Sequence, residues 1–320
     1  MIEIVSGAVA EKLVGHDDAI AAIREMFLAM EAGTSLNFPP MRGHGSDPAT
    51  RFGVKAGFDG ARGLPGLKVG SYWPGNPARG LPAHGSTTLL LDDRTGFPIA
   101  LVEATWLNGL RTAASDAIAV DALARQDARV LAVIGTGNQA YHEMRAVSLV
   151  RSPQAVLVVG RSVEKAEELA SRLSSDGLAA RAASLDEALL LADVIVTATA
   201  ARGPLFAAGA VRPGTHISAM GADGPGKQEL PGELAARARL FADAPEQSIQ
   251  IGEFQHLADG PGAAGITGIG SVLAGRASGR TSAEEITIYD SSGFGLQDIA
   301  IAALALDRAR AAGLVEQVAF

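Results

Sequence analysis

Two charged side chains, Asp223 and Lys227, lie in a stretch that is otherwise made of turn-forming residues. Residues 221–231 read GADGPGKQELP, and the glycines and prolines favour a tight loop whose backbone can approach a ligand closely. A carboxylate and an ammonium in such a loop can exchange protons with a bound molecule. Asp223 lies too far before Pro231 to cap a helix that starts there. The spacing argues against helix capping, and whether Asp223 takes part in chemistry depends on the rest of the chain.

A glycine-rich turn predicts a second functional feature, a dinucleotide site. Residues 133–140 read VIGTGNQA, which fits the pattern G-x-G-x-x-A between a predicted strand and a predicted helix. In that context the glycines permit a tight turn, and the helix N-terminus offers N–H groups to a pyrophosphate. A glycine turn without a ligand is the alternative, and the strand order around it favours the nucleotide. The predicted cofactor contacts are Gly135, Thr136, Gly137, Asn138, Gln139 and Ala140.

The end of the next predicted strand bears on the form of the cofactor. The chain there reads Val159-Gly160-Arg161-Ser162, at a position where an acidic residue normally binds the ribose of NAD. An Arg with a Ser suits the 2′-phosphate of NADP instead. Alternatively, Arg161 stacks on an adenine or lies on a solvated turn. The sequence leaves NAD and NADP open, with Arg161 and Ser162 as predicted contacts.

Hydrophobic patterning predicts that these residues are carried by two different architectures. After Arg129, runs of Val, Ile and Leu alternate with amphipathic helices, which is typical of a parallel sheet covered on both faces. Between residues 35 and 98, short apolar runs broken by Gly and Pro indicate antiparallel strands. Helices are expected over residues 105–126 and 296–313, and over 17–32 with Asp17 or Asp18 as the N-cap.

The predicted fold class is therefore α/β. A Rossmann domain with a doubly wound parallel sheet is expected over residues 116–295. A smaller α+β substrate-binding domain of antiparallel strands is expected over residues 1–115 and 296–320.

Composition narrows the classes of partner. The net charge of −8 and the pI near 5.3 argue against nucleic acid or an anionic membrane surface as the partner. The chain contains no cysteine, which excludes disulfides and thiolate metal sites, and its six histidines are scattered, so no metal is expected. No signal segment or membrane-spanning stretch is recognisable, and a cytoplasmic location is expected.

Several long segments together resemble the ornithine cyclodeaminase and mu-crystallin family of nicotinamide-dependent enzymes that handle imines. They are PPMRG around Arg42, GLKVGSYWPGNPARGLPAHG around Lys68, ALVEATWLNGLRTAA around Arg111, VIGTGNQA, ISAMGADGPGKQELP and DSSGFGLQDIAIAALAL. They follow one another in the family's order from residue 39 to residue 306. The resemblance implies a substrate domain that also forms the interface of a homodimer, and a Rossmann domain inserted before the final helix.

The resemblance also assigns roles to individual residues. It implies that Arg42, Lys68 and Arg111 hold the substrate α-carboxylate, to which an Arg can bind in bidentate fashion. It implies that Asp223 is the catalytic acid or base and that Lys68 shares the proton transfer to the substrate nitrogen. The implied cofactor contacts beyond the fingerprint are Thr112, Thr199, Met220, Lys227 and Ser292.

The chemistry within this family depends on the segment between Arg42 and Lys68. A cyclodeaminase must bind a second substrate ammonium, which requires a carboxylate there. The segment contains no Glu. Its charged and titratable residues are His44, Asp47, Arg51, Lys55, Asp59 and Arg62, and His44 is counted with the predicted substrate contacts.

Lys55 departs most clearly from the family pattern, since the family commonly has Pro at this position. A cation on this predicted strand would repel a substrate ammonium and attract a second carboxylate. The leading hypothesis is NAD(P)H-dependent reduction of a dicarboxylic imino acid, such as iminosuccinate to aspartate. If Lys55 points to solvent, a monocarboxylic cyclic imine is the alternative substrate. A cyclodeaminase that recycles NAD and a ligand binder without turnover remain further alternatives.

Overall fold

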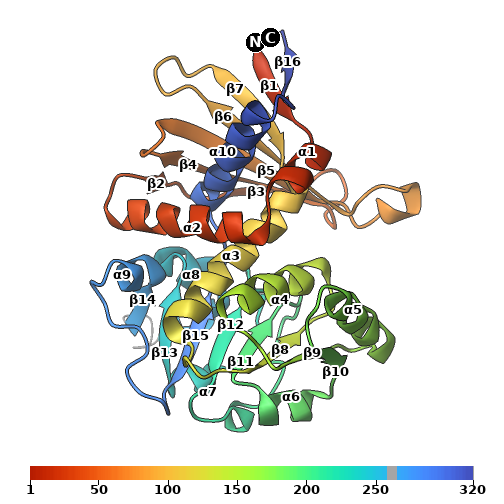
Figure 1. Ribbon diagram of the computed structural model, residues 1–320, viewed down its shortest axis with the longest axis vertical. Helices are drawn as coiled ribbons and strands as arrows, with labels where there is room; N and C mark the ends of the chain where they lie inside the picture. Colours follow the sequence, from red (N-terminus) through yellow and green to blue (C-terminus); the bar gives the residue numbers. More distant parts are fainter. Residues whose placement is uncertain (258–264, 320) are drawn as a thin grey trace. The chain divides into compact units, whose positions relative to one another are not determined.

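The structure is a computed structural model that describes residues 1–257 and 265–319. The chain forms two compact units, one from Met1–Arg111 with Phe294–Phe320 and one from Thr112–Gly293. The boundaries thus lie at residues 111 and 293, whereas the sequence places them at 115 and 295. The helix α3 (Thr105–Leu123) runs through the first boundary (Figure 1).

The first unit is built on one sheet with the strand order β16-β1-β7-β6-β5-β4-β2, and β3 also pairs with β4. The predicted antiparallel strands are confirmed, and β1 adds one parallel pair with β7, so the sheet is mixed. Its elements are β1 (Ile2–Val5), α1 (Gly7–Leu13), α2 (His16–Glu31), β2 (Leu36–Asn37), β3 (Met41–Gly43), β4 (Arg51–Asp59), β5 (Leu64–Tyr72), η1 (Pro77–Arg79), β6 (His84–Leu91), β7 (Pro98–Glu103), α10 (Gly295–Ala311) and β16 (Glu316–Val318).

Helix α10 packs across strands β4 and β5 of this sheet (Figure 1). Glycines allow a close approach: a Cβ atom at Gly295 would lie 2.5 Å from the backbone N and O atoms of Ala56 in β4. Likewise, a Cβ atom at Gly57 would lie 3.1 Å from the backbone N of Leu296. A larger side chain at either position would push the helix off the sheet. The approach brings the first turn of α10, with Asp298, to the sheet surface.

The second unit is a fully parallel sheet with the order β10-β9-β8-β11-β12-β15-β13-β14. The predicted doubly wound Rossmann sheet is confirmed, and β15 pairs between β12 and β13. Its elements are β8 (Val130–Ile134), α4 (Asn138–Val150), β9 (Ala155–Val159), α5 (Val163–Ser175), β10 (Ala180–Ala182), α6 (Leu185–Leu191), β11 (Val194–Thr197), η2 (Ala208–Ala210), β12 (His216–Ala219), α7 (Gly232–Ala235), β13 (Ala238–Ala242), α8 (Pro245–Ile251), η3 (Glu253–Leu257), β14 (Ile266–Gly268), α9 (Ile269–Leu273) and β15 (Ile286–Asp290).

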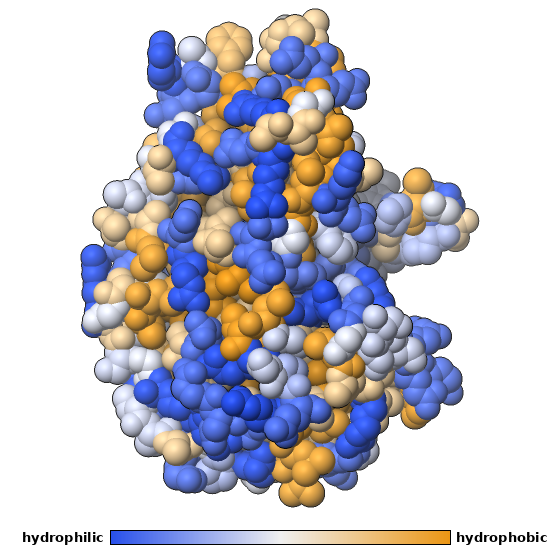
Figure 2. All heavy atoms as spheres, in the orientation of Figure 1, coloured by the Kyte–Doolittle hydropathy of each residue, from blue (hydrophilic) through white to orange (hydrophobic). Residues whose placement is uncertain are grey.

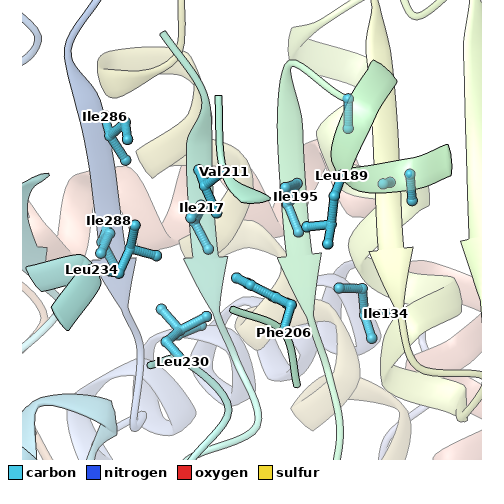
Figure 3. Packing of buried hydrophobic residues seen from close by; sticks show 14 of the residues in the cluster. Ile134, Leu189, Ile195, Phe206, Val211, Ile217, Leu230, Leu234, Ile286 and Ile288 are labelled. Carbon is cyan, nitrogen blue, oxygen red and sulfur yellow. The ribbon is translucent and has the colours of Figure 1, made fainter. Parts of the chain in front are cut away.

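One face of this parallel sheet carries a large apolar core. Alternate strand residues such as Ile134, Ile195, Ile217 and Ile288 point to the same side, where Phe206 packs among them (Figure 3). The strands are buried on both faces, which explains their nearly continuous apolar runs in the sequence.

Helix α2 begins earlier than predicted. Its N-cap is Gly15, and Asp18 occupies the third helical position, where its carboxylate accepts a hydrogen bond from the Gly15 N–H at 3.0 Å. The expectation that Asp17 or Asp18 is the N-cap was therefore wrong. An acidic side chain at the third position accepts a hydrogen bond from a free N–H group at the helix N-terminus, as an N-cap side chain also does. The sequence pattern therefore did not distinguish the two.

The visible surface mixes hydrophilic and hydrophobic residues rather than forming an apolar band (Figure 2). Among the described residues, no helix combines the length and the apolarity that crossing a membrane requires.

Candidate active site

Three of the predicted cations point to one face of the sheet in the first unit. Lys55 of β4 is directly opposite Lys68 of β5, and Arg42 of β3 is opposite Gly53 of β4. Opposite residues of an antiparallel pair point to the same face, and so do residues two apart in one strand. This face also carries Gly57 and is therefore the face on which α10 packs. The register thus places Lys55 with Lys68 instead of on the opposite face.

Lys68 is buried in a polar network. Its ammonium donates to Asp298 Oδ1 at 2.8 Å and to Asn108 Oδ1 at 2.9 Å, and its exposed fraction is 6%. Asp298 comes from the first turn of α10 and Asn108 from α3. Three elements distant in sequence therefore converge on one ammonium group.

Arg111 belongs to the same network. Its guanidinium donates to Asn108 Oδ1 at 2.7 Å and to Gln297 Oε1 at 3.0 Å. Its Nε lies 3.1 Å from Asp298 Oδ1. The structure thus brings Lys68 and Arg111 together around a single carboxylate, which leaves an excess of positive charge for an anionic substrate.

The surroundings of Lys68 make it suitable for proton transfer near neutral pH. Burial lowers the pKa of the Lys68 ammonium to about 7, and while Asp298 opposes this shift, Arg111 and Lys55 reinforce it. Burial alone would raise the pKa of Asp298, but the three cations outweigh it and hold that pKa below its ordinary value. Lys68 can therefore change its protonation at physiological pH while Asp298 stays ionised.

Three titratable residues of the segment between Arg42 and Lys68, namely His44, Asp47 and Asp59, are outside the network of Lys68. His44 follows β3, is exposed, and its Nδ1 lies 2.7 Å from the carbonyl oxygen of Gly45. Asp47 and Asp59 both accept hydrogen bonds from nearby backbone N–H groups, those of Ala49 and Ala61. These two carboxylates stabilise turns of the chain.

In the second unit, the predicted cofactor residues follow the carboxyl ends of parallel strands. Gly135 follows β8, Thr199 follows β11, Met220 follows β12 and Ser292 follows β15. These four strands are neighbours in the sheet, and all run in the same direction. Open α/β sheets bind ligands at this edge.

The glycine fingerprint fits a dinucleotide. Gly135 has φ +140°, and a Cβ atom there would lie 2.5 Å from the carbonyl oxygen of Ala198, so only glycine is tolerated. A Cβ atom at Gly137 would meet no protein atom within 4 Å, which leaves room for a phosphate group. Gly137 is also the N-cap of the 13-residue helix α4 and makes no side-chain cap, so the N–H groups of the first turn can bind an anion.

The two residues expected near the adenosine ribose have different environments. Arg161 is exposed. The Ser162 hydroxyl donates to Glu164 Oε2 at 2.6 Å and accepts from the N–H of Lys165, as the N-cap of α5. The structure therefore adds a carboxylate, Glu164, that the sequence interpretation did not consider.

The start of the loop that carries Asp223 is hydrogen-bonded to a buried carboxylate, that of Glu229. Lys227 Nζ lies 2.5 Å from Asp223 Oδ1 and 3.1 Å from the carbonyl oxygen of Gly221. Glu229 is fully buried and accepts hydrogen bonds from the Gly221 N–H and from the Thr199 N–H and hydroxyl. Burial raises its pKa, and these hydrogen bonds partly offset that shift. Glu229 therefore ties the ends of β11 and β12 together.

The remaining predicted cofactor contacts are Ser292, Met220 and Thr112. The first two take part in hydrogen bonds within the protein, and the third is buried. Ser292 Oγ accepts from Gln247 at 2.8 Å, and the Met220 N–H donates to the Thr197 carbonyl. Thr112 is buried within α3. Their contacts with a cofactor stay predictions.

Sequence reasoning missed the residues that organise the site. Asp298, Gln297 and Asn108 surround Lys68 and Arg111, and Glu229 organises the Asp223 loop. All four lie inside segments that the resemblance had singled out. No pattern in the sequence distinguishes them, because their partners lie far away along the chain. Within the described parts of the chain, no group of three or more His, Asp or Glu residues is arranged to hold a metal ion.

The glycine fingerprint at the edge of a doubly wound sheet, together with the similarity to NAD-bound reductases and dehydrogenases, identifies a nicotinamide-dinucleotide-dependent oxidoreductase of the Rossmann type. Within that class, the chain belongs to the ornithine cyclodeaminase/mu-crystallin family, whose model matches residues 3–313. The resemblance drawn from the sequence is thereby confirmed.

Several known proteins are similar to nearly the whole of this chain. It is 40% identical over 320 residues to the iminosuccinate reductase of Paracoccus denitrificans, covering 97% of this chain and 98% of that protein. The crystal structure of iminosuccinate reductase of Paracoccus denitrificans in complex with NAD+ superposes with a TM-score of 0.95 at 37% identity, covering 100% and 99% of the two chains. An archaeal alanine dehydrogenase dimer with bound NAD gives 0.94 at 34% identity, covering 100% and 99%.

Proposed function

We propose that this protein reduces a dicarboxylic imino acid to an amino acid, with iminosuccinate to aspartate as the leading reaction. The observation that carries the proposal is the register of β4 and β5, which puts Lys55 on the same face as Lys68 and directly opposite it. The similarity to an iminosuccinate reductase supports the same substrate.

The charges of the first unit suit a substrate with two carboxylates. Lys68 and Arg111 already share Asp298 and form the site for the α-carboxylate, with Arg42 on the same sheet face. Lys55 supplies a further cation one strand away, where a distal carboxylate would bind. A substrate with a single carboxylate, bound by Lys68 and Arg111, would offer no second anionic group to Lys55.

The reaction needs a hydride on the imine carbon and a proton on the nitrogen. A bound NADH would supply the hydride, and it would be held by the fingerprint from Gly135 to Ala140. The proton would come from Lys68 or Asp223, whose side chains are the predicted acids. The balanced equation is iminosuccinate + NADH + H⁺ → aspartate + NAD⁺.

The cyclodeaminase alternative has less support. That reaction requires a carboxylate to bind the side-chain ammonium of a diamino acid. Asp47 and Asp59 stabilise turns, and Asp298 is bonded to Lys68 and lies beside Arg111. The excess of cations would repel a second ammonium group.

We infer NADH rather than NADPH as the cofactor. Ser162 donates to Glu164, and a carboxylate beside that hydroxyl disfavours the 2′-phosphate of NADPH. The similar structures that contain NAD+ or NAD support the same form.

We also infer a cytoplasmic homodimer. The sheet face opposite α10 carries apolar residues on four strands, with Thr87 and Glu103 at one end: the apolar ones include Val54, Ala56, Phe58, Leu67, Val69, Leu89 and Leu101. Val69 is 41% exposed. A second copy of the chain is the partner that suits this face, as in the alanine dehydrogenase dimer.

A substrate panel with matched variants tests the proposed function. NADH oxidation is followed with oxaloacetate plus ammonia, which form iminosuccinate, and with a cyclic monocarboxylic imine. Lys55→Met should lower kcat/KM for the dicarboxylic substrate by about 10- to 100-fold, the value of one charge-assisted hydrogen bond. It should affect the cyclic imine little.

Lys165→Met is the matched control, because Lys165 is an exposed lysine of the other unit. Equal losses for both substrates would contradict the distal-carboxylate site. Ammonia release from ornithine without net NADH oxidation would establish the cyclodeaminase instead, and binding without turnover of any imine would establish a binding protein.

A further inference from the structure

Lys68 has an arrangement of acceptors that fixes the direction of its ammonium group. An ammonium has three N–H donors, and two of them are taken by Asp298 Oδ1 at 2.8 Å and Asn108 Oδ1 at 2.9 Å. Among the described residues, the third N–H has no acceptor. The two bonds therefore leave one donor whose direction is set by the protein.

Asp298 is the more constrained of the two acceptors. It is 2% exposed, and its Oδ1 receives Lys68 while lying 3.1 Å from Arg111 Nε. Its backbone is held against the sheet by the close contact of Gly295 with Ala56. The position of this carboxylate is thus determined by the packing of α10.

We propose that Asp298 is the positioning residue of the active site, which holds the Lys68 ammonium in place and aims its remaining N–H at the substrate. Asp298 does not touch the reacting atoms in this scheme and acts through Lys68. The inference rests on the proposed function for the identity of the substrate, but the contact between Asp298 and Lys68 does not.

The contact between Asp298 and Lys68 also affects the protonation of Lys68. Among the described residues, the charged groups that face Lys68 are Lys55 from β4, Arg111 from α3 and Asp298 from α10. The opposite residue of β6 is Thr88, which does not titrate. Asp298 is thus the only one of these that favours the charged form of Lys68. Without it, Lys68 would lose its proton at lower pH.

The test uses the full-length protein and a direct titration of Lys68. The chain contains five lysines, so isotope-labelled lysine gives few NMR signals, and Lys68→Met assigns the one of interest. In Asp298→Asn the titration midpoint of Lys68 should fall by about 1 to 3 pH units. The kcat measured at pH 7.5 should fall with it and recover as the pH is lowered, since a larger fraction of Lys68 is then protonated.

A charge-conserving variant separates position from charge. Asp298→Glu keeps a carboxylate, so the Lys68 midpoint should stay near its original value. Its longer side chain displaces the ammonium, and kcat should fall by about 10- to 100-fold at all pH values. Lys55→Met should raise the midpoint, because it removes a repelling cation. Asp307→Asn is the control from the same helix, where the side chain is 57% exposed.

Two results would overturn the proposal: an unchanged Lys68 midpoint in Asp298→Asn, or an unchanged kcat in Asp298→Glu. If Asp298→Asn does not fold, Asp298→Glu decides alone. The NMR titration needs no substrate. A shifted midpoint in a protein that reduces no imine would therefore support the positioning role and reject the proposed function.

Discussion

At the scale of single residues, the two predicted proton donors lie in opposite environments. Lys68 is buried, and burial lowers its pKa to about 7, a shift that Asp298 opposes and that Arg111 and Lys55 reinforce. Asp223 is 57% exposed and is paired with Lys227 on an otherwise turn-forming loop. A buried group is held in one geometry, whereas an exposed loop carboxylate can adjust its position when a substrate binds. The catalytic role of each side chain stays a prediction that its own variant tests.

Asp223→Asn tests the role of the loop carboxylate. The amide cannot take up or release a proton, so we expect kcat to fall by about 10²- to 10⁴-fold. The Kd for NADH, measured by fluorescence, should change little. Asp127→Asn is the control, since Asp127 is 76% exposed and pairs with an Arg in the same unit. Near-normal turnover of Asp223→Asn would remove this residue from the chemistry.

The sequence predicted the cations better than their counter-ion. Arg42, Lys68 and Arg111 stand in long segments that resemble the family, and the structure places the last two in one network. Asp298 was missed because its role depends on the packing of a helix against a strand. Such a contact is three-dimensional and has no local pattern.

At the scale of elements, the two fingerprint glycines are required for different reasons: Gly135 by the fold and Gly137 by the predicted ligand. Gly135 is required by the fold because of its positive φ and its closeness to Ala198. Gly137 has an ordinary extended conformation and open space beside it. The protein alone would therefore accept an alanine at Gly137 but not at Gly135.

This difference predicts opposite phenotypes for two alanine variants. Gly137→Ala should change the Tm by no more than about 3 °C and weaken NADH binding by about tenfold or more, because the methyl group occupies space for the pyrophosphate. Gly135→Ala should lower the Tm by more than that, since its backbone is strained. Thermal unfolding and NADH titration measure both. Wild-type NADH affinity in Gly137→Ala would argue against a pyrophosphate at this turn.

Long elements were predicted well and short ones were not. The helices predicted over residues 105–126 and 296–313 are present as α3 and α10, because segments of this length show a clear helical period. The strands β10 and β14 have three residues each, too few to show alternation. The side of the sheet to which Lys55 points was also open, because a shift of one residue in register reverses it. Only the pairing of β4 with β5 determines that.

At the scale of the whole molecule, the apolar outer face of the first sheet predicts the assembly. Val69→Glu would bury a carboxylate in the proposed interface of two copies, which costs several kcal/mol. We expect the dimer Kd to rise by about 100-fold or more, measured by analytical ultracentrifugation. Val163→Glu is the control, since Val163 is 63% exposed and lies in the first turn of a helix in the other unit. A monomeric wild-type protein would refute the interface.

The discontinuous first unit has a consequence for how the chain is made. Lys68 and its counter-ion Asp298 are separated by 230 residues. A ribosome releases the second unit, which is continuous in sequence, before it releases α10. During synthesis, the N-terminal part of the first unit therefore exists before Asp298 is available to pair with Lys68 and Arg111. The contact between Lys68 and Asp298 therefore forms only after the whole second unit has been synthesised.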